Sequence, residues 1–379
     1  MQVIFLAVVL YDILKLINGV LIFLMMDTRR KGRKEPELVC LGIESTAHTF
    51  GASVVRFSGK DRFSVLSNER DLYTTEKEGL VPFKVAEHHL NAFDTVIMSA
   101  LSKAGKSLKD ICLVSFSQSP GLGPTLRIGA TAAKSISVQN SIPVVGVNHC
   151  IAHLEIGRAL AKDMSGKGCT DPVLLYASGA NTQIIAYAAG KYRVFGESLD
   201  IGIGNFLDTL ARHMGMGFPG GPKIYENSLK FNPDVHRIID IPYCVKGMDV
   251  NFGGILTFLK RKFDSKEYGI IEICYSAQEI AFAMLLEVTE RAMAHTGKNE
   301  LLLGGGVACN KRLNEMARIM CAERGASLFI LENQFYVDNA AMIALTGIQK
   351  FRATGAERLK DLDIDPYLRT DDVEVTWRD

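Results

Sequence analysis

The succession of apolar and polar stretches predicts two halves that share one plan. In the first half, two apolar runs flank a short polar turn, at residues 37–43, 45–48 and 50–57. The same pattern returns in the second half, at residues 173–177, 178–182 and 183–189. Apolar runs on both sides of a polar turn are typical of a β-hairpin, so each half is expected to begin with a hairpin that has a polar tip.

Strands and helices are expected to alternate after each hairpin. The expected strands are residues 63–67, 111–116, 144–147, 192–197, 301–303 and 327–331. The expected helices are residues 85–104, 128–139, 149–161, 205–214, 277–295 and 310–324. This alternation predicts an α/β fold with mixed sheets flanked by helices. Two halves that face each other would leave a cleft lined by the polar tips, which suits a nucleotide.

The composition agrees with a large folded chain. Of the 379 residues, 47% are hydrophobic and 22% are charged, which is enough for two hydrophobic cores and excludes a disordered or fibrous protein. We expect an N-terminal extension at residues 1–36, a first lobe at residues 37–170 and a second lobe at residues 171–379. A helical insertion is expected near residues 216–275.

The N-terminal extension is apolar and then basic. A charged residue near the centre of a membrane-spanning helix costs about 2.5 to 3.5 kcal/mol, so Asp12 and Lys15 make residues 3–26 a poor spanning helix. The start of the chain lacks the basic residues of a secretory signal, and the segment lacks the Arg and Ser of a mitochondrial presequence. Two alternatives stay open for this segment. Translation could start at Met25 or Met26, or the segment could anchor the chain to a membrane. Of these, we do not expect the membrane anchor.

Charge and cysteine content limit the partners and the compartment. Lys and Arg number 43 against 42 for Asp and Glu, so a nucleic acid would have to be held locally or by other subunits. The eight cysteines include no C-x-x-C pair, which argues against a zinc ribbon and a disulfide framework. We therefore expect a reducing, intracellular compartment.

A pair of histidines has the spacing of metal ligands. His149 and His153 lie four residues apart at the start of an expected helix, so both imidazoles face the same way. Asp338, at the start of the last long helix, could supply a third, oxygen ligand, or could only cap that helix. Chance spacing on a surface helix is the alternative for the pair. The zinc-protease motif has Glu where this chain has Cys150, so a protease would lack its base.

Glycine-rich segments are the second sign of a ligand site. Residues 301–310 run from an apolar strand through three glycines into a helix, which would let backbone amides approach an anion. A close crossing of strand and helix is the alternative. Residues 120–125 form a similar turn, but Leu126 stands where a dinucleotide fingerprint needs its third glycine. We expect His88 and His89 to be structural.

Seven segments together resemble one known family. They are residues 42–48, 121–124, 147–153, 176–183, 246–249, 305–307 and 369–377. These segments are similar to the tRNA threonylcarbamoyladenosine synthesis family that includes OSGEP and bacterial TsaD, in order from Val39 to the C-terminus. Residues 148–153 and 374–377 resemble the branch found in the KEOPS complex. The resemblance implies a duplicated actin-like, sugar-kinase-like ATPase fold with a cleft between its lobes.

The resemblance also implies the site residues. One divalent metal cation per subunit, with Fe, Zn and Mg left open, would be held by His149, His153 and Asp338, with Tyr176 beside it. The adenylate substrate would be held by Tyr176, Ala177, Ser178, Gly179, Ala180, Asp208, Gly221, Tyr225 and Asn310. No covalent protein nucleophile is implied.

The implied reaction is a transfer to tRNA. The threonylcarbamoyl group would pass from threonylcarbamoyl-AMP to N6 of the adenosine 3' of the anticodon, in tRNAs that read ANN codons. The chain would be the catalytic subunit of a KEOPS-type complex with an atypical kinase-like ATPase and a small dimerising subunit, in the cytoplasm and nucleus. The alternative is another metal- and ATP-dependent kinase or carbamoyltransferase of the same fold.

The chain departs from the family pattern at four positions. Ala180 and Ala340 stand where glycine is usual, Tyr225 replaces a glutamate, with Glu226 adjacent, and Gly253 replaces a serine. The methyl group of Ala180 and the loss of a carboxylate at Tyr225 raise the question of whether substrate binding is altered.

Overall fold

The computed structural model describes residues 37–59, 62–75 and 81–378. The chain forms two compact units. The first contains the described residues up to Tyr73, Val81–Ile156 and the chain from Asn339 onward, and the second consists mainly of Gly157–Asp338. The N-terminal extension, and with it the expected start at Met25 or Met26, lies outside the described residues. Within the described part, none of the helices has the length and apolar character needed to cross a bilayer.

The first unit is built on a five-stranded sheet of order β3-β2-β1-β4-β5. These strands are β1 (Leu38–Glu44), β2 (Thr49–Phe57), β3 (Phe63–Leu72), β4 (Leu113–Ser119) and β5 (Val144–Asn148). The first three form an antiparallel meander, whereas β4 and β5 run parallel to β1. Every residue of β1 is buried, as expected of a central strand that is covered on both faces.

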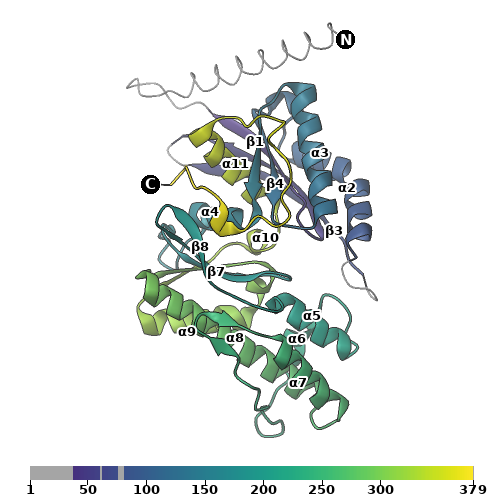
Figure 1. Ribbon diagram of the computed structural model, residues 1–379, viewed down its shortest axis with the longest axis vertical. Coiled ribbons are helices and arrows are strands. Elements are labelled where there is room, and N and C mark those ends of the chain that lie inside the picture. Colours follow the sequence, from purple (N-terminus) through teal and green to yellow (C-terminus); the bar gives the residue numbers. More distant parts are fainter. Residues whose placement is uncertain (1–36, 60–61, 76–80, 379) are drawn as a thin grey trace. The chain divides into compact units, whose positions relative to one another are not determined.

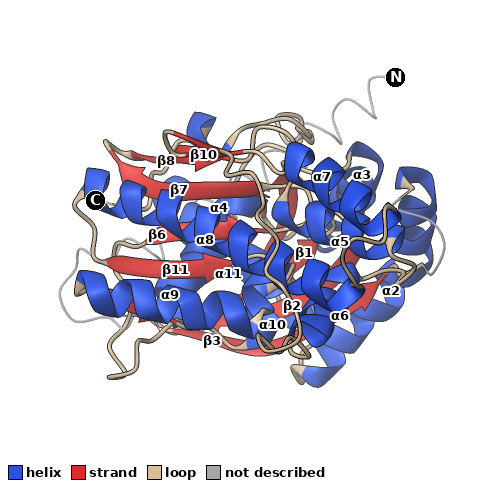
Figure 2. Ribbon diagram, turned by 90° about the horizontal axis from the view of Figure 1, so that it is seen from below, coloured by secondary structure: helices blue, strands red, loops and turns tan. Residues whose placement is uncertain are grey.

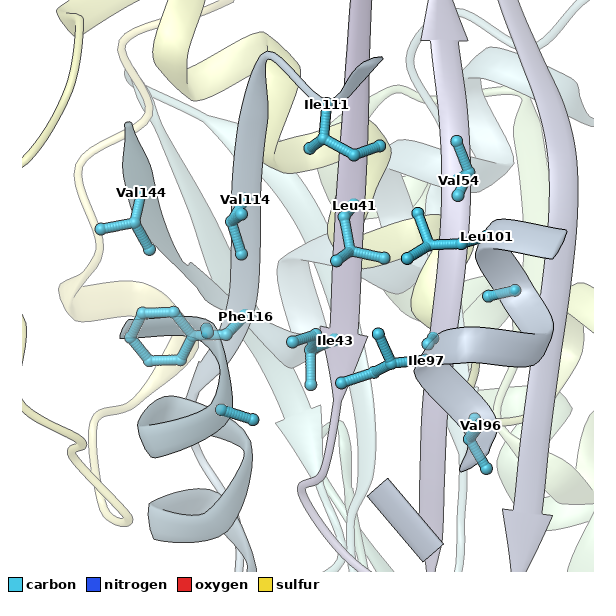
Figure 3. Packing of buried hydrophobic residues seen from close by; sticks show 14 of the residues in the cluster. Leu41, Ile43, Val54, Val96, Ile97, Leu101, Ile111, Val114, Phe116 and Val144 are labelled. Carbon is cyan, nitrogen blue, oxygen red and sulfur yellow. The ribbon is translucent and has the colours of Figure 1, made fainter. Parts of the chain in front are cut away.

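Helices cover both faces of this sheet. The helices α2 (Pro82–Lys103) and α3 (Gly123–Asn140) pack on one face, where Leu41 and Ile43 of β1 join the hydrophobic core. Figure 3 shows these two side chains between β4 and helix α2. Side chains alternate along a strand, so Gly42 lies on the opposite face of the sheet from Leu41 and Ile43. Helix α11 (Ala340–Thr354) packs on that face. A Cβ at Gly42 would lie 2.6 Å from the backbone N of Ala344, so glycine permits this close packing.

The packing of α11 corrects the expected lobe boundaries. The sequence placed residues 171–379 together, but the chain from Asn339 onward belongs to the first unit, since α11 contacts β1, β2 and β4. In Figure 1 the yellow helix α11 lies against strands that come from the other end of the sequence. The other boundary falls inside α4 (His149–Leu160), after Ile156 rather than at residue 170.

The second unit repeats the plan of the first. Its sheet has the order β12-β11-β6-β7-β8, formed by β6 (Val173–Ala177), β7 (Thr182–Ala188), β8 (Lys191–Glu197), β11 (Glu300–Gly304) and β12 (Ser327–Phe329). The pairings are again an antiparallel meander followed by two parallel strands. The middle strand of each meander has a register shift, after Val54 in β2 and after Ile184 in β7. The predicted α/β duplication is therefore confirmed.

Helices cover the second sheet and form the insertion. They are α5 (Ile203–His213), α6 (Gly220–Ser228), α7 (Gly253–Asp264), α8 (Ile270–Thr296), α9 (Lys311–Arg324) and α10 (Asn333–Tyr336). Figure 2 shows α8 and α9 alongside the strands, and these two helices contact each other. The expected helical insertion contains α6, α7 and a small hairpin of β9 (Val245–Lys246) and β10 (Asp249–Val250). Single 3-10 turns occur at η1 (Leu108–Asp110), η2 (Gly306–Cys309) and η3 (Thr370–Asp372).

The chain after α11, which we call the C-terminal strap (residues 357–377), binds the first unit along its edge. Glu357 accepts a hydrogen bond from the backbone N–H of Gly146 at 2.8 Å, which satisfies a backbone group of the edge strand β5. The backbone carbonyl of Asp363 accepts a bond from Gln118, and Trp377 donates its indole N–H to Glu155 of α4 at 3.0 Å. The strap therefore joins β4, β5 and α4.

Candidate functional site

The two histidines lie on the buried side of α4. Strand β5 runs into this helix without a loop, and the Asn148 side chain accepts a hydrogen bond from the backbone N–H of Ile151, so the helix is capped at its start. His149 and His153 are 4% and 1% exposed, and their ring centroids are 4.8 Å apart. The predicted common orientation is confirmed. Both side chains are buried, so the pair does not lie on a surface helix, and its role as metal ligands stays a prediction.

Asp338 is not the cap of the last long helix. That role belongs to Asn339, whose side-chain oxygen accepts a hydrogen bond from the backbone N–H of Met342 at 3.0 Å. Asp338 directly precedes the cap, and the peptide bond to Asn339 ties it to the first unit. One ligand atom each of His149, His153 and Asp338 lies within 4.8 Å of the others. The three side chains proposed as metal ligands therefore come together.

The donor set fits a transition metal. Ligand atoms about 2.1 Å from a tetrahedral ion lie about 3.4 Å apart, so small side-chain adjustments would close this cluster around a cation. Two imidazoles and one carboxylate suit Zn²⁺ or Fe²⁺, whereas Mg²⁺ prefers oxygen ligands in nearly octahedral geometry. Three protein ligands also leave coordination positions open for a substrate.

A buried glutamate touches this cluster, and sequence reasoning did not assign it a role. Glu44 is the last residue of β1 and is fully buried. Its Oε2 lies 2.9 Å from Nδ1 of His149, and its Oε1 accepts hydrogen bonds from the backbone N–H and the hydroxyl of Thr46. The signal that could have found it is a charged residue at the end of an apolar strand, just before a hydroxyl-rich turn.

The turn at residues 120–125 supports this arrangement, and two of its amides are bonded within the protein. The N–H of Leu122 donates to the carbonyl of Thr46 at 2.8 Å, and the N–H of Gly121 donates to the carbonyl of Pro366. A Cβ at Gly121 would lie 2.7 Å from the Thr46 carbonyl oxygen. Glycine at this position therefore permits the close approach of the turn to the first tip (residues 45–48).

In the second unit, the polar turn after β6 is exposed. We call residues 178–181 the second tip, and Gly179 and Ala180 lie at the surface. The backbone carbonyls of Ser178 and Gly179 accept hydrogen bonds from the N–H groups of Gly204 and Asn205, at the start of α5. Ala180 is not among the described non-glycine residues with positive φ, so its methyl group causes no backbone strain.

In the glycine-rich segment at residues 301–310, a glycine permits close packing of the backbone, which was the alternative to a ligand site. Gly305 has a φ of +85°, and a Cβ there would lie 2.6 Å from the carbonyl carbon of Ala177. Both the left-handed backbone and this close approach to β6 require glycine. In contrast, a Cβ at Gly306 would meet nothing within 4 Å. Gly305 is therefore explained by packing.

Two of the residues expected to bind the adenylate have structural partners, and a third is buried. Asp208 accepts hydrogen bonds from the N–H groups of Gly220 and Gly221, at 2.6 and 3.3 Å, and so caps α6. Asn310 caps α9 through the N–H groups of Arg312 and Leu313, and its amide also donates to Gln278. Tyr176 is 2% exposed. Their roles in substrate binding stay predictions.

His89 is buried within the first unit. Its pKa is lowered from the ordinary 6.5 to about 4, first because burial disfavours the charged ring and then because His88 and His48 lie nearby. The ring of Phe50 contacts it edge to face. The expected structural role of this histidine agrees with its position in the core.

Comparison with known proteins places the chain in a family. Residues 64–345 match the family model of TsaD, tRNA N6-adenosine threonylcarbamoyltransferase. The chain is 49% identical to the tRNA N6-adenosine threonylcarbamoyltransferase of Thermococcus kodakarensis, over 90% of this chain and 100% of that protein. The chain belongs to the TsaD family. The predicted enzyme class is thereby confirmed, and nothing in these matches favours the alternative kinase or carbamoyltransferase.

Other similar proteins agree with this membership. The chain is 46% identical to a probable bifunctional tRNA threonylcarbamoyladenosine biosynthesis protein of Methanothermobacter thermautotrophicus, over 90% of this chain and 61% of that protein. Among solved structures, HypF of T. kodakarensis aligns with a TM-score of 0.56 at 13% identity, over 87% of this chain and 49% of HypF. At that identity the likeness concerns the fold alone. The actin-like ATPase fold of this family agrees with the two matching sheets.

Proposed function

We propose that this chain transfers the threonylcarbamoyl group of threonylcarbamoyl-AMP to N6 of the adenosine 3' of the anticodon in tRNAs that read ANN codons. The new bond joins N6 to the carbamoyl carbon, the bond from that carbon to the phosphate oxygen breaks, and AMP leaves while N6 loses a proton. The observation that carries the proposal is the cluster of His149, His153 and Asp338 in a chain of the TsaD family.

The cluster would hold one divalent metal cation. A bound cation would stabilise negative charge that develops on carbonyl or phosphate oxygens. The donor set favours Zn²⁺ or Fe²⁺ over Mg²⁺. The proposal includes Tyr176 as a residue beside the metal, by resemblance to the family. The protein would then orient the two substrates and exclude water. No side chain has to form a covalent intermediate.

The adenylate would bind at the second tip and the helix starts around it. Ser178, Gly179 and Ala180 are accessible, and the N-terminus of α5 lies directly beside them. The first N–H groups of α5 are bonded to the carbonyls of the tip and to the hydroxyl of Thr182, so this helix fixes the shape of the tip. Asp208, Gly221, Tyr225 and Asn310 complete the proposed set, with Asp208 and Asn310 acting at least partly by fixing the starts of α6 and α9. Ala177 belongs to the set as the residue that precedes the tip.

The proposal includes tRNA and the KEOPS-type subunits as partners. A net charge of +1 gives one chain little electrostatic attraction for tRNA. This agrees with tRNA binding that is shared among several subunits. On the first unit, an apolar groove of about 900 Å³ lies between α2 and α3. Phe83 and Leu90 line it and are 76% and 60% exposed, which supports the docking of a small dimerising subunit there. We place the reaction in the cytoplasm, and also in the nucleus.

The test is the nucleoside content of tRNA. Cells that depend on this chain for their threonylcarbamoyladenosine should lose that nucleoside when the chain is depleted, and should regain it with the wild-type protein. Re-expression of His295→Ala, which replaces an exposed histidine on α8, serves as the matched control and should also restore it. Mass spectrometry of tRNA digests gives the answer. An unchanged nucleoside content after depletion would contradict the proposal.

A further inference from the structure

Glu44 is a buried acidic residue that the proposed reaction leaves without a role. It ends the central strand β1 and has no exposed surface. An isolated carboxylate in such a place is costly unless hydrogen bonds compensate for the lost water. Here both carboxylate oxygens are engaged, one with Thr46 and one with His149. The charge is thus held in one defined orientation.

The contacts divide between the two oxygens. Oε1 accepts from the backbone N–H of Thr46 at 2.7 Å and from the Thr46 hydroxyl. Oε2 lies 2.9 Å from Nδ1 of His149. Since a carboxylate can only accept, Nδ1 of His149 is the atom that carries the hydrogen. Nε2 of the same ring is then the unprotonated nitrogen, which is the form of an imidazole nitrogen that can coordinate a cation.

Thr46 itself is fixed by the neighbouring turn. Its carbonyl oxygen accepts a hydrogen bond from the N–H of Leu122. A Cβ at Gly121 would lie 2.7 Å from the same oxygen, so the turn packs closely against Thr46. Gly129 of α3 lies equally close to Ser45, where an added Cβ would come within 2.8 Å of the serine Cβ. The first tip is therefore a rigid support for the carboxylate.

We propose that Glu44 is a positioning residue for the metal site: it holds His149 with Nδ1 protonated and so presents Nε2 to the divalent cation. The inference rests on the proposed function, because it assumes that His149 is a metal ligand. A carboxylate that accepts from a ligating histidine fixes the tautomer and the ring orientation, and raises the basicity of the ligand.

The first test is metal affinity in the full-length protein. Glu44→Gln keeps the shape of the side chain but removes the charge, and Zn²⁺ affinity, measured by competition with a chelator, should fall about 10- to 100-fold. Thr46→Val removes only the hydroxyl and should lower the affinity less. The matched control is Glu155→Gln, which changes a second buried carboxylate of the same unit that faces Trp377 and Gln349 and should leave Zn²⁺ affinity within about twofold.

The second test needs no variant. In the Zn²⁺-loaded wild-type protein, ¹⁵N spectra of the histidines should show a protonated Nδ1 and a metal-bound Nε2 at His149. Metal on Nδ1 would overturn the inference. So would unchanged Zn²⁺ affinity in Glu44→Gln, provided that His149→Ala does lose the metal. If neither the wild type nor any variant binds Zn²⁺ or Co²⁺, the metal centre of the proposed function fails, and the inference fails with it.

Discussion

The two polar tips follow equivalent strands and yet have opposite surroundings. In the first tip Ser45 and Thr46 are buried, and the strand before it ends in Glu44. In the second tip Gly179 and Ala180 are exposed, and the strand before it ends in Ala177. Equivalent hairpins would therefore serve two purposes in the proposed function. The first would support a metal ligand from inside the fold, and the second would leave surface residues for a small molecule.

The largest expected effect comes from the cluster that the first tip supports. His153→Ala should lower threonylcarbamoyl transfer at least about 100-fold, because a bound cation contributes several kcal/mol to the transition state. His153 is 1% exposed, so a loss of folding stability of about 1 to 3 kcal/mol is also expected. Transfer assays and thermal melting measure both. Normal transfer in His153→Ala would remove the metal centre from the mechanism.

Acid should weaken the first unit selectively, because His89 packs beneath its tip. The folded pKa of about 4 lies below the ordinary 6.5, so the unfolded chain binds the proton more tightly. Stability is therefore complete above pH 6.5 and falls by up to about 3 kcal/mol as the pH drops toward 4. After burial, the nearby His88 and His48 also lower the pKa of His89.

Hydrogen exchange at pH 7 and pH 5 measures this selectivity. The strands β1 and β2 should lose protection at pH 5, and β6 and β7 should change less. His89→Gln should flatten the pH dependence, whereas the exposed control His295→Gln should not. Equal loss of protection in both sheets, unchanged by His89→Gln, would contradict the assignment.

A matched pair of glycine substitutions sharpens the comparison of the tips. In Gly121→Ala a Cβ would lie 2.7 Å from the Thr46 carbonyl, and in Gly204→Ala one would lie 2.7 Å from Cα of Gly179. Each should destabilise the protein by about 1 to 3 kcal/mol, since backbone must move. Gly121→Ala should weaken Zn²⁺ binding, and Gly204→Ala should not. Gly204→Ala should instead weaken binding of the adenylate. Equal loss of metal in both variants would mean that the tips do not have separate roles.

Much of the fold follows from the apolar pattern, but the boundaries of the units do not. Strand β6 has the bounds expected from its apolar run, and α4 begins at His149 as expected. The return of α11 to the first sheet depends on contacts of Gly42 with a helix about 300 residues later in the chain, and no local pattern reports such packing. The helix expected at residues 128–139 begins earlier, at Gly123, because Pro124 is favoured in a first turn.

The site could be predicted only as far as spacing and resemblance reach. The i, i+4 spacing located His149 and His153, and the family resemblance joined Asp338 to them. Glu44 was missed because a single acidic residue at the end of a strand is normally a surface residue. Asp338 was expected as an alternative cap, but the cap is the next residue, Asn339, and only the geometry of the helix start distinguishes the two.

The most direct test of the central claim is the metal content of Asp338→Asn. The cap of α11 is supplied by Asn339, so this variant should melt within a few degrees of the wild type. The control Asn339→Ala removes the cap, and should lose about 1 kcal/mol of stability while keeping the metal. We expect purified Asp338→Asn to lose bound metal and threonylcarbamoyl transfer together. Stoichiometric metal and wild-type transfer in this variant would contradict the account.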